Sequence, residues 1–505
     1  MESAASLSDL VLGIDASTTA CKAIAFDARG VAAGEGRAPI ALQHPAPDAW
    51  EQDAEAWWTA LGAATRELTT KVDAARIVGL SIAQQRETFV VTSESGEPLA
   101  PGIVWMDHRC KRDVTRAIEA IGAERLHAVS GKPPCTTPSL YKIMGLFARE
   151  PTLLGRTGKV LDVHALLAWR LTGRCATSLA SADPTGMLDM VAGDWSAELF
   201  SLAGLARRHL PELALPGVVL GRVTREASLA TGLPEGLPVV AGAGDGQAAG
   251  LGAGLVDGRT AYLNLGTAVV SGVLASSYRH ARAFRTLFAA QPGSYFLETD
   301  LQGGTFTVTW LVEKLLGRRL PEALVELEAE ASRVAPGADG LVLVPYWNGV
   351  MNPYWDDFAS GLVVGLRGHH GPGQLLRALY EGLALEQRLH TMGVEEALGE
   401  RVEELVVVGG GSKSALLCQI VADVLGRPIA RASTAEATAL GAAMLAAVGT
   451  GMHPTLEAAA GAMTARGERF LPGEARRDYD ALFAVYRTIY PALRAPLAEL
   501  ERCRS

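Results

Sequence analysis

The chain has 505 residues, of which 49% are hydrophobic and 20% charged, and its net charge is −9. At about 150 residues per domain, this length predicts two large or three modest globular domains. The acidic balance argues against a protein whose main task is to hold nucleic acid. It does not exclude an anionic ligand, because backbone amides and a metal can bind nucleotides without a basic surface.

Cysteine usage and terminal composition indicate a cytoplasmic enzyme. The six cysteines are dispersed, with no CxxC pair, so we expect reduced thiols. The N-terminal sequence MESAASLSDL lacks the pattern of a signal peptide. Residues 437–456 are uncharged and long enough to span a bilayer, but they are mostly Ala, Gly and Thr and are broken by His453 and Pro454. We therefore expect a buried helix that ends near Gly449, and no membrane span.

The first predicted element is a hairpin over residues 10–30, with two apolar strands joined by a tight turn. A related pattern recurs at residues 261–274, AYLNLGTAVVSGVL. Two such hairpins roughly 250 residues apart suggest duplicated domains. No low-complexity linker divides the chain, and the most plausible boundary lies near Val256 to Gly258.

Between the hairpins, residues 77–91 and 99–105 read as strands, whereas residues 160–173 and 194–205 read as helices. After residue 275 strands are followed by long helices. Residues 404–426 combine a buried strand, a glycine turn and a helix. Alternation of this kind predicts an α/β fold.

Asp245 stands alone in a glycine-rich turn, within VVAGAGDGQAAGLGAG at residues 239–254. Glycine allows a ligand to approach the backbone closely. A carboxylate there is free to take a proton from a bound hydroxyl. The simpler alternative is an ordinary turn in which the aspartate caps the next helix.

Further turns carry the chemistry of a nucleotide site. Asp15, Ser17, Thr18 and Thr19 crowd the first hairpin turn, where amides and hydroxyls can bind phosphate and the carboxylate can hold Mg²⁺. The alternative is a turn that satisfies only its own backbone. Gly266 and Thr267 offer the same chemistry in the second hairpin.

The segment GGGSKS (409–414) follows a strand and opens a helix, which is a favourable place for a nucleotide. It lacks the last glycine of the GxGxxG fingerprint, and the chain has no GxxxxGK[ST] loop. Neither a Rossmann dehydrogenase nor a P-loop NTPase fits.

These turns together resemble the phosphate and adenosine motifs of the sugar kinase, actin and Hsp70 superfamily. More narrowly, the chain resembles FGGY carbohydrate kinases, and xylulokinases among them most, from about residue 10 to 490. The supporting stretches are DAWEQDAEAWW (48–58), GIVWMDHR (102–109), WRLTGRCATSLASADPTGMLDM (169–190), LVPYWNGVMNPYWDDFASGLVVGL (343–366) and EATALGAAMLA (436–446).

The resemblance implies two duplicated ribonuclease-H-like (actin-like ATPase) domains with a cleft between them. Residues 1–256 would bind the sugar and carry the catalytic base, and residues 257–505 would bind the nucleotide. Such kinases transfer the γ-phosphate of MgATP to a hydroxyl of a ketose or polyol, here D-xylulose first, giving D-xylulose 5-phosphate. By position, Asp245 is the general base and a metal ligand, and Asp15 holds Mg²⁺ through water. The implied nucleotide-binding residues are Asp15, Ser17, Thr18, Thr19, Lys22, Gly266, Thr267, Gly303, Gly304, Gly410, Gly411 and Ser414.

The acceptor pocket departs from the xylulokinase pattern. Arg86 and Glu87 match an Arg-Glu pair that grips the polyol in glycerol kinases, but Thr137 stands where those enzymes have a tyrosine. Gly246 follows Asp245 where relatives have Asn or Gln. The implied substrate-binding residues are Gln85, Arg86, Glu87, Trp105, Asp245 and Gly246. Three simpler interpretations stay open: a mutual Arg86–Glu87 salt bridge, core packing of Trp105, and a purely structural role for His164.

Other functions compete with a D-xylulose kinase. Within the enzymes, the alternatives are a glycerol or other polyol kinase and a kinase for another pentulose such as ribulose. Outside them, an actin-like fold also suits a nucleotide-dependent regulator, but a regulator has no need of a base at Asp245. We expect a small-molecule sugar and MgATP as partners, and no nucleic acid or membrane. A homodimer stays open.

Overall fold

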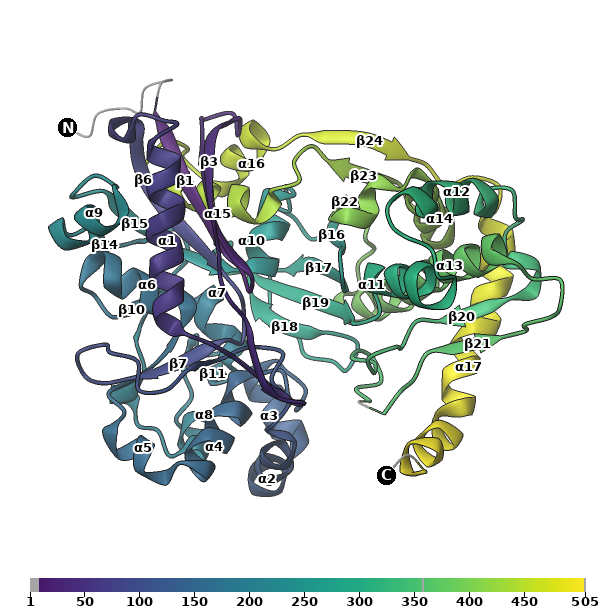
Figure 1. Cartoon of the computed structure of the whole chain (residues 1–505), viewed down its shortest axis with the longest axis horizontal. Helices are drawn as coiled ribbons and strands as arrows, with labels where there is room; N and C mark the ends of the chain where they lie inside the picture. The colour runs from purple at the N-terminus through teal and green to yellow at the C-terminus, as the bar shows by residue number, and fades with distance from the viewer. Residues whose placement is uncertain (1–8, 357, 504–505) are drawn as a thin grey trace.

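Two large β-sheets lie side by side along the long axis of the computed structural model, which describes residues 9–356 and 358–503 (Figure 1). The first sheet follows the order β14 (Val219–Arg222), β15 (Pro238–Gly244), β6 (Ile77–Gln84), β1 (Leu10–Ala16), β2 (Ala20–Phe26) and β3 (Ala32–Pro39). β1 and β2 form the predicted antiparallel hairpin, and β6 and β15 continue the sheet in parallel.

The second sheet repeats this arrangement. Its order is β18 (Arg285–Phe288), β19 (Tyr295–Leu301), β17 (Val269–Ala275), β16 (Thr260–Leu265), β22 (Glu404–Val408), β23 (Ile429–Ala432) and β24 (Arg466–Phe470). β16 pairs antiparallel with β17 and parallel with β22, as β1 does with β2 and β6. The prediction of two duplicated α/β domains is therefore confirmed.

A third, five-stranded sheet packs below the first and corrects two predicted strands. Its order is β4 (Gln43–Ala46), β5 (Ala49–Gln52), β8 (Gly102–Ile103), β7 (Phe89–Thr92) and β9 (Lys159–Asp162). The strand expected over residues 77–91 is broken between β6 and β7, where Glu87 has a φ of 55°. The strand expected over residues 99–105 shrinks to β8. The short paired strands are β10 (Ala176–Ser178), β11 (Leu188–Asp189), β12 (Asp194–Trp195), β13 (Glu212–Ala214), β20 (Val342–Val344) and β21 (Leu362–Val364).

The helix expected over residues 160–173 is confirmed in part, since β9 precedes α6 (Val163–Thr172) and Gly173 ends the helix with a φ of 74°. The helix expected over residues 194–205 is mostly wrong, because it contains only α8 (Ala197–Phe200) and a 3₁₀ turn. The remaining helices are α1 (Ala54–Thr69), α2 (Lys111–Ile121), α3 (Ala123–Ser130), α4 (Ser139–Arg149), α5 (Pro151–Arg156), α7 (Leu179–Ala182), α9 (Arg225–Thr231), α11 (Thr305–Thr309), α12 (Glu322–Ala331), α13 (Pro372–Leu398), α14 (Ala415–Leu425), α16 (Leu456–Met463) and α17 (Arg476–Arg502), together with α10 and α15 below.

Two helices, α10 and α15, pack against each other between the two large sheets, and each contacts the sheet of the other half of the chain. α10 (Asp245–Gly252) follows the first sheet in the chain, yet its Ala249 and the C-cap residue Ala253 join the apolar cluster of the second sheet. α15 (Ala437–Gly449) belongs to the second half of the chain and packs on β1, β6 and β15 of the first sheet. The two halves of the chain are therefore interleaved in their packing.

The uncharged run at residues 437–456 is confirmed as a buried helix that ends at Gly449. Among residues 9–356 and 358–503, no helix combines the length and the apolar content that a membrane crossing needs.

Candidate active site

Asp245 is the first residue of α10, directly after β15. Its side chain is 41% exposed, and its Oδ1 forms an ion pair with Arg86 Nε at 2.9 Å and accepts a hydrogen bond from Gly246 N at 2.8 Å. Gly244, not Asp245, occupies the N-cap position of the helix. Partial removal from water raises the pKa of Asp245, and Arg86 opposes that rise. The carboxylate therefore lies beside a cation, and its Oδ2 takes part in neither of these two contacts.

The Arg86 side chain lies across the bare backbone of this turn. A Cβ at Gly244 would stand 2.6 Å from Arg86, and one at Gly246 would stand 3.0 Å from Arg86 and 2.9 Å from Glu298. A side chain at either position would therefore displace Arg86 or one of its neighbours. Gly246 therefore makes room for an arginine and its partner, where the resembling kinases carry an amide side chain.

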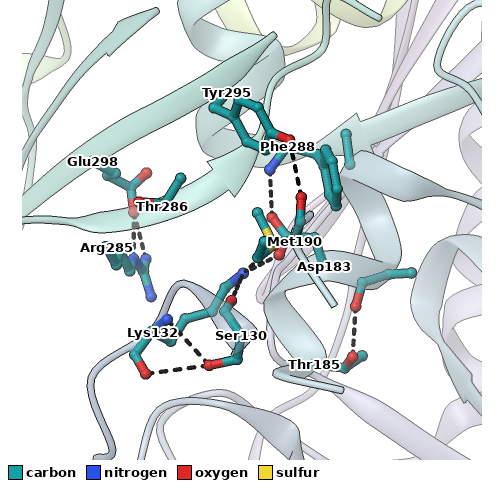
Figure 2. A network of polar contacts seen from close by, with 12 residues as sticks. Ser130, Lys132, Asp183, Thr185, Met190, Arg285, Thr286, Phe288, Tyr295 and Glu298 are labelled. Atoms are coloured by element: carbon teal, nitrogen blue, oxygen red, sulfur yellow. Dashed lines mark hydrogen bonds and ion pairs between the residues drawn. The ribbon is translucent and has the colours of Figure 1, made fainter. Parts of the chain in front are cut away.

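Arg86 begins a chain of buried charges that joins the two halves. Its Nη1 contacts Glu298 Oε2 at 2.7 Å. Arg285 contacts the other oxygen, Glu298 Oε1, at 2.6 Å (Figure 2). Arg285 Nη1 in turn contacts Glu87 Oε1 at 2.8 Å. The mutual Arg86–Glu87 salt bridge weighed from the sequence is therefore not formed, and each residue pairs with the second half.

This ion network consists of Asp245, Arg86, Glu298, Arg285 and Glu87, with three carboxylates and two cations. Four of the five side chains are at most 9% exposed, and only Asp245 is open to solvent. Burial raises the pKa of Glu298, but Arg285 and Arg86 outweigh it and hold that pKa below its usual value. An incoming proton therefore goes to Asp245, where it neutralises the network.

Sequence reasoning missed Glu298 and Arg285. They are directly paired neighbours on β19 and β18, within otherwise apolar segments, YFLETDL and RTLF. A buried charge needs a partner, so two opposite charges in apolar strands were the available signal.

A second buried ion pair lies beside the network. Lys132 Nζ contacts Asp183 Oδ1 and donates to the Ser130 carbonyl at 2.8 Å, and Asp183 Oδ2 accepts from Phe288 N at 2.6 Å (Figure 2). Burial lowers the pKa of Lys132 and raises that of Asp183, although each opposes the shift of the other. Because Phe288 belongs to β18, this pair also ties the first half to the second sheet.

Asp15 ends β1 and has the features of a metal-binding carboxylate. Its Oδ1 is buried and has no hydrogen-bond partner within the described part of the chain. Burial, together with Asp245, raises the pKa of Asp15 to about 7, and Lys22 opposes the rise. β1 and β15 flank β6, so Asp15 and Asp245 lie two strand spacings, roughly 10 Å, apart. Lys22 is held by Glu436 at 2.7 Å.

The three hydroxyl residues of the first hairpin turn differ in their contacts, since two are hydrogen-bonded within the protein and one is exposed. Ser17 Oγ donates to the Ala20 carbonyl at 2.8 Å, which is the self-satisfied turn weighed from the sequence. Thr18 Oγ1 accepts from Trp105 Nε1 at 3.0 Å, and Thr19 is exposed. Trp105 is 41% exposed, so core packing does not explain it. Gln85 is buried, and its Nε2 donates to Gln52 Oε1 at 2.9 Å.

The glycine turns of the second half meet around Leu265. A Cβ at Gly411 would stand 3.0 Å from the Leu265 carbonyl, whereas Gly410 is open. Thr305 Oγ1 donates to the Gly266 carbonyl at 2.8 Å, and Thr267 is exposed.

Three other predicted nucleotide residues have structural contacts in this region. Gly303 and Gly304 are buried, against the Pro345 carbonyl and the Thr267 turn, so they support that turn from behind. Ser414 caps α14 by accepting from Leu417 N at 3.1 Å.

His164 is structural, as the simpler interpretation holds. It is fully buried, its Nε2 accepts from Gly242 N at 3.0 Å, and its Nδ1 lies 3.2 Å from Thr177 Oγ1. Both ring nitrogens are therefore occupied, by contacts to β15 of the first sheet and to β10 of a separate two-stranded sheet.

Comparisons with known proteins agree with this geometry. The FGGY family of carbohydrate kinases matches with its N-terminal domain over residues 10–252 and its C-terminal domain over residues 261–450. The xylulose kinase of Lactococcus lactis is 28% identical, over 95% of this chain and 96% of its own. A glycerol kinase of Geobacter sp. is 31% identical, over 92% of this chain and 94% of its own. The solved xylulose kinase of Rhodospirillum rubrum superposes with a TM-score of 0.91 at 29% identity, covering 97% of this chain and all of that one.

The two matched domains cover most of the chain, and Asp245 lies near the C-terminal end of the first match, where it opens α10. The predicted family, fold and enzyme class are confirmed: the chain belongs to the FGGY family of carbohydrate kinases and is an ATP-dependent sugar kinase.

Proposed function

We propose that this kinase phosphorylates a ketose and that its preferred acceptor is D-xylulose, which it converts to D-xylulose 5-phosphate. The observation that carries the proposal is Asp245, the one solvent-open carboxylate of a buried ion network in a glycine turn. Relatives named xylulose kinase, similar over nearly the whole chain, favour a pentulose.

Asp245 acts as the general base. Arg86 and the Gly246 amide hold Oδ1, so Oδ2 receives the proton of the attacking hydroxyl. The network then changes from one excess negative charge to none, which favours proton uptake at this place. Phosphoryl transfer otherwise depends on positioning and charge neutralisation, so one base and oriented donors suffice.

Mg²⁺ fits the residues present, because Asp15 offers a buried carboxylate oxygen without a protein partner. Asp15 would hold the ion through water, with Asp245 nearby. When bound, Mg²⁺ neutralises charge on the phosphates. The exposed Thr19 and Thr267 and the open Gly410 support binding of ATP at the two hairpin turns and the GGGSKS turn. Ser17, Gly303, Gly304 and Ser414 shape those turns, and Lys22 acts through its pair with Glu436.

The acceptor binds between Asp245 and Trp105. Arg86 uses Nε and Nη1 for its ion pairs, which leaves the Nη2 donors for a sugar oxygen. Trp105 is partly exposed and anchored to Thr18, so it can offer its ring face to the sugar. Gln85 and Glu87 are enclosed by protein contacts and fix the shape of the pocket.

The enzyme would divide its tasks as the sequence suggests, with residues 1–256 holding the sugar and residues 257–505 holding the nucleotide. A cytoplasmic location suits the use of ATP. Cysteine chemistry supports it, because no disulfide joins the cysteines of the described residues.

Glycerol kinase is the second candidate. The Arg86–Glu87 pair and the 31% identity to a glycerol kinase favour a polyol. Thr137, where glycerol kinases carry a tyrosine, leaves room for the larger ketose.

The test is ADP release with MgATP across D-xylulose, D- and L-ribulose, glycerol and ribitol. We expect D-xylulose to give the highest kcat/KM. Preference for glycerol over every pentulose would overturn D-xylulose as the acceptor but not the kinase activity. Turnover of none of them would also overturn the proposed acceptor and place the true one outside this panel.

A further inference from the structure

A cavity of about 240 Å³ lies on the far side of the second half, between α13, the loop before β22, the end of α14 and the start of α17. It is lined by Arg388, Thr391, Met392, Glu395, Arg401, Leu425, Arg427, Arg476 and Asp480. α14 separates this cavity from the GGGSKS turn: Ser414 caps the helix at one end, and Leu425 lines the cavity at the other. An 11-residue helix is about 16 Å long, so the cavity is distinct from the proposed nucleotide site.

The cavity wall carries an excess of positive charge. Two of its four arginines have carboxylate partners, since Arg427 contacts Glu395 at 2.5 Å and Arg388 contacts Asp480 at 2.7 Å. Arg401 and Arg476 form no ion pair and no side-chain hydrogen bond with any described residue. Two uncompensated guanidinium groups therefore face one small cavity in a chain whose net charge is −9.

Two further observations point to a missing anion. Arg427 is 8% exposed, yet its buried Nε–H finds no acceptor among the described residues, so its hydrogen bonding is incomplete beside the cavity. Arg476 is the first residue of α17, where the partial positive charge of the helix N-terminus adds to its own. Arg401 and Arg476 are exposed, so water screens their charges in part, and an anion between the guanidinium groups would remove the remaining repulsion.

We propose that this arginine cavity is a binding site for a small phosphate-bearing anion. Guanidinium groups match phosphate oxygens with paired, charge-assisted hydrogen bonds. The volume is below the ~300–1,000 Å³ of pockets for drug-sized ligands, which favours inorganic phosphate or a small phosphate monoester over a nucleotide. The site is independent of the proposed acceptor and of turnover.

Isothermal titration with inorganic phosphate, and separately with glycerol 1-phosphate, tests the site on the full chain at low salt. A saturating non-hydrolysable ATP analogue with Mg²⁺ fills the transfer site in one series and is omitted in the other. We expect wild-type protein to bind at least one probe in both series, and Arg401→Ala/Arg476→Ala to bind it at least tenfold more weakly. Tighter binding of the ester would identify a phosphorylated metabolite as the ligand, and tighter binding of inorganic phosphate would identify the free ion.

The matched control is Arg225→Ala/Arg477→Ala, which removes the same charge from two exposed arginines outside the cavity lining. It should bind like the wild type. Circular dichroism should show both double variants folded, because none of the four side chains forms an ion pair within residues 9–356 and 358–503. Equal affinities in the two double variants, or no binding of either probe by the wild type, would overturn the proposal.

Discussion

Single residues decide which carboxylate of the ion network carries the proton. Glu298 contacts two guanidinium groups and stays ionised, whereas Asp245 contacts one and faces solvent. Gly244 and Gly246 allow Arg86 to lie close to the turn. The base thus depends on residues from both halves.

Asp245→Asn should lower kcat by ~10²–10⁴-fold, because the amide cannot accept the hydroxyl proton. The variant should fold, since the remaining network has two cations and two carboxylates. Steady-state kinetics and equilibrium binding of ATP check it, and ATP affinity should change little. Near-normal kcat at saturating sugar would refute Asp245 as the base.

Glu298→Gln tests the positioning of Arg86. The negative charge of Glu298 contributes to the raised pKa of Asp245, so its removal should lower that pKa. The acid limb of the kcat/KM profile should move to lower pH, and kcat/KM should fall at neutral pH as Arg86 loses its anchor. Glu404→Gln, a change on β22 outside the network, is the control and should leave the profile unchanged. An unshifted limb in Glu298→Gln would contradict this role.

Elements were predictable where local pattern decides them. The hairpins β1–β2 and β16–β17 and the helix α15 follow from apolar periodicity and turn residues. The break between β6 and β7 was not predictable from the sequence. It depends on Glu87, which adopts a positive φ while its side chain pairs with Arg285, 198 residues away. Asp245 was predictable as a site residue because it stands in a glycine-rich turn. Glu298 and Arg285 were not predictable, because which strands pair with each other depends on the tertiary structure.

His164 on α6 accepts a hydrogen bond from Gly242 on β15, and this buried contact makes the free energy of unfolding depend on pH. Burial lowers the pKa of His164 to about 4, from 6.5 in the unfolded chain. A depressed histidine pKa means that the unfolded chain binds the proton more tightly, so stability is lost as pH falls from about 6.5 to 4. The loss is about 3 kcal/mol at ~1.4 kcal/mol per pKa unit. Urea unfolding at several pH values should show a smaller acid loss in His164→Gln; an equal loss would exclude His164 as its source.

The crossing of α10 and α15 depends on backbone contact. A Cβ at Gly441 would stand 1.9 Å from the Ala248 carbonyl, so Gly441→Ala should push the helices apart and cost ~1–3 kcal/mol. Gly461→Ala in α16 meets nothing within 4 Å and is the matched control, expected to be neutral or slightly stabilising. Thermal unfolding measures both, and equal midpoints would show that the crossing tolerates a side chain.

At the scale of the whole molecule, each sheet is covered by a helix from the other half of the chain (Figure 1). α10 carries Asp245 at its start, so rotation about the crossing would move the base relative to the nucleotide turns of the second half. Such a junction can absorb a small shear without breaking either sheet.

We therefore expect the two halves to close when sugar and nucleotide are both bound, with the pivot at α10, α15 and the segment near residue 256. The proposed phosphate-binding turns, at residues 15–19 and 266–267, come from different halves but serve the same phosphates. Closure also excludes water, which competes with the sugar as acceptor. Small-angle scattering with sugar plus a non-hydrolysable ATP analogue should give a smaller radius of gyration than the free protein, with nucleotide alone as the control. Identical profiles in all states, with binding of both ligands verified, would show that the halves do not close.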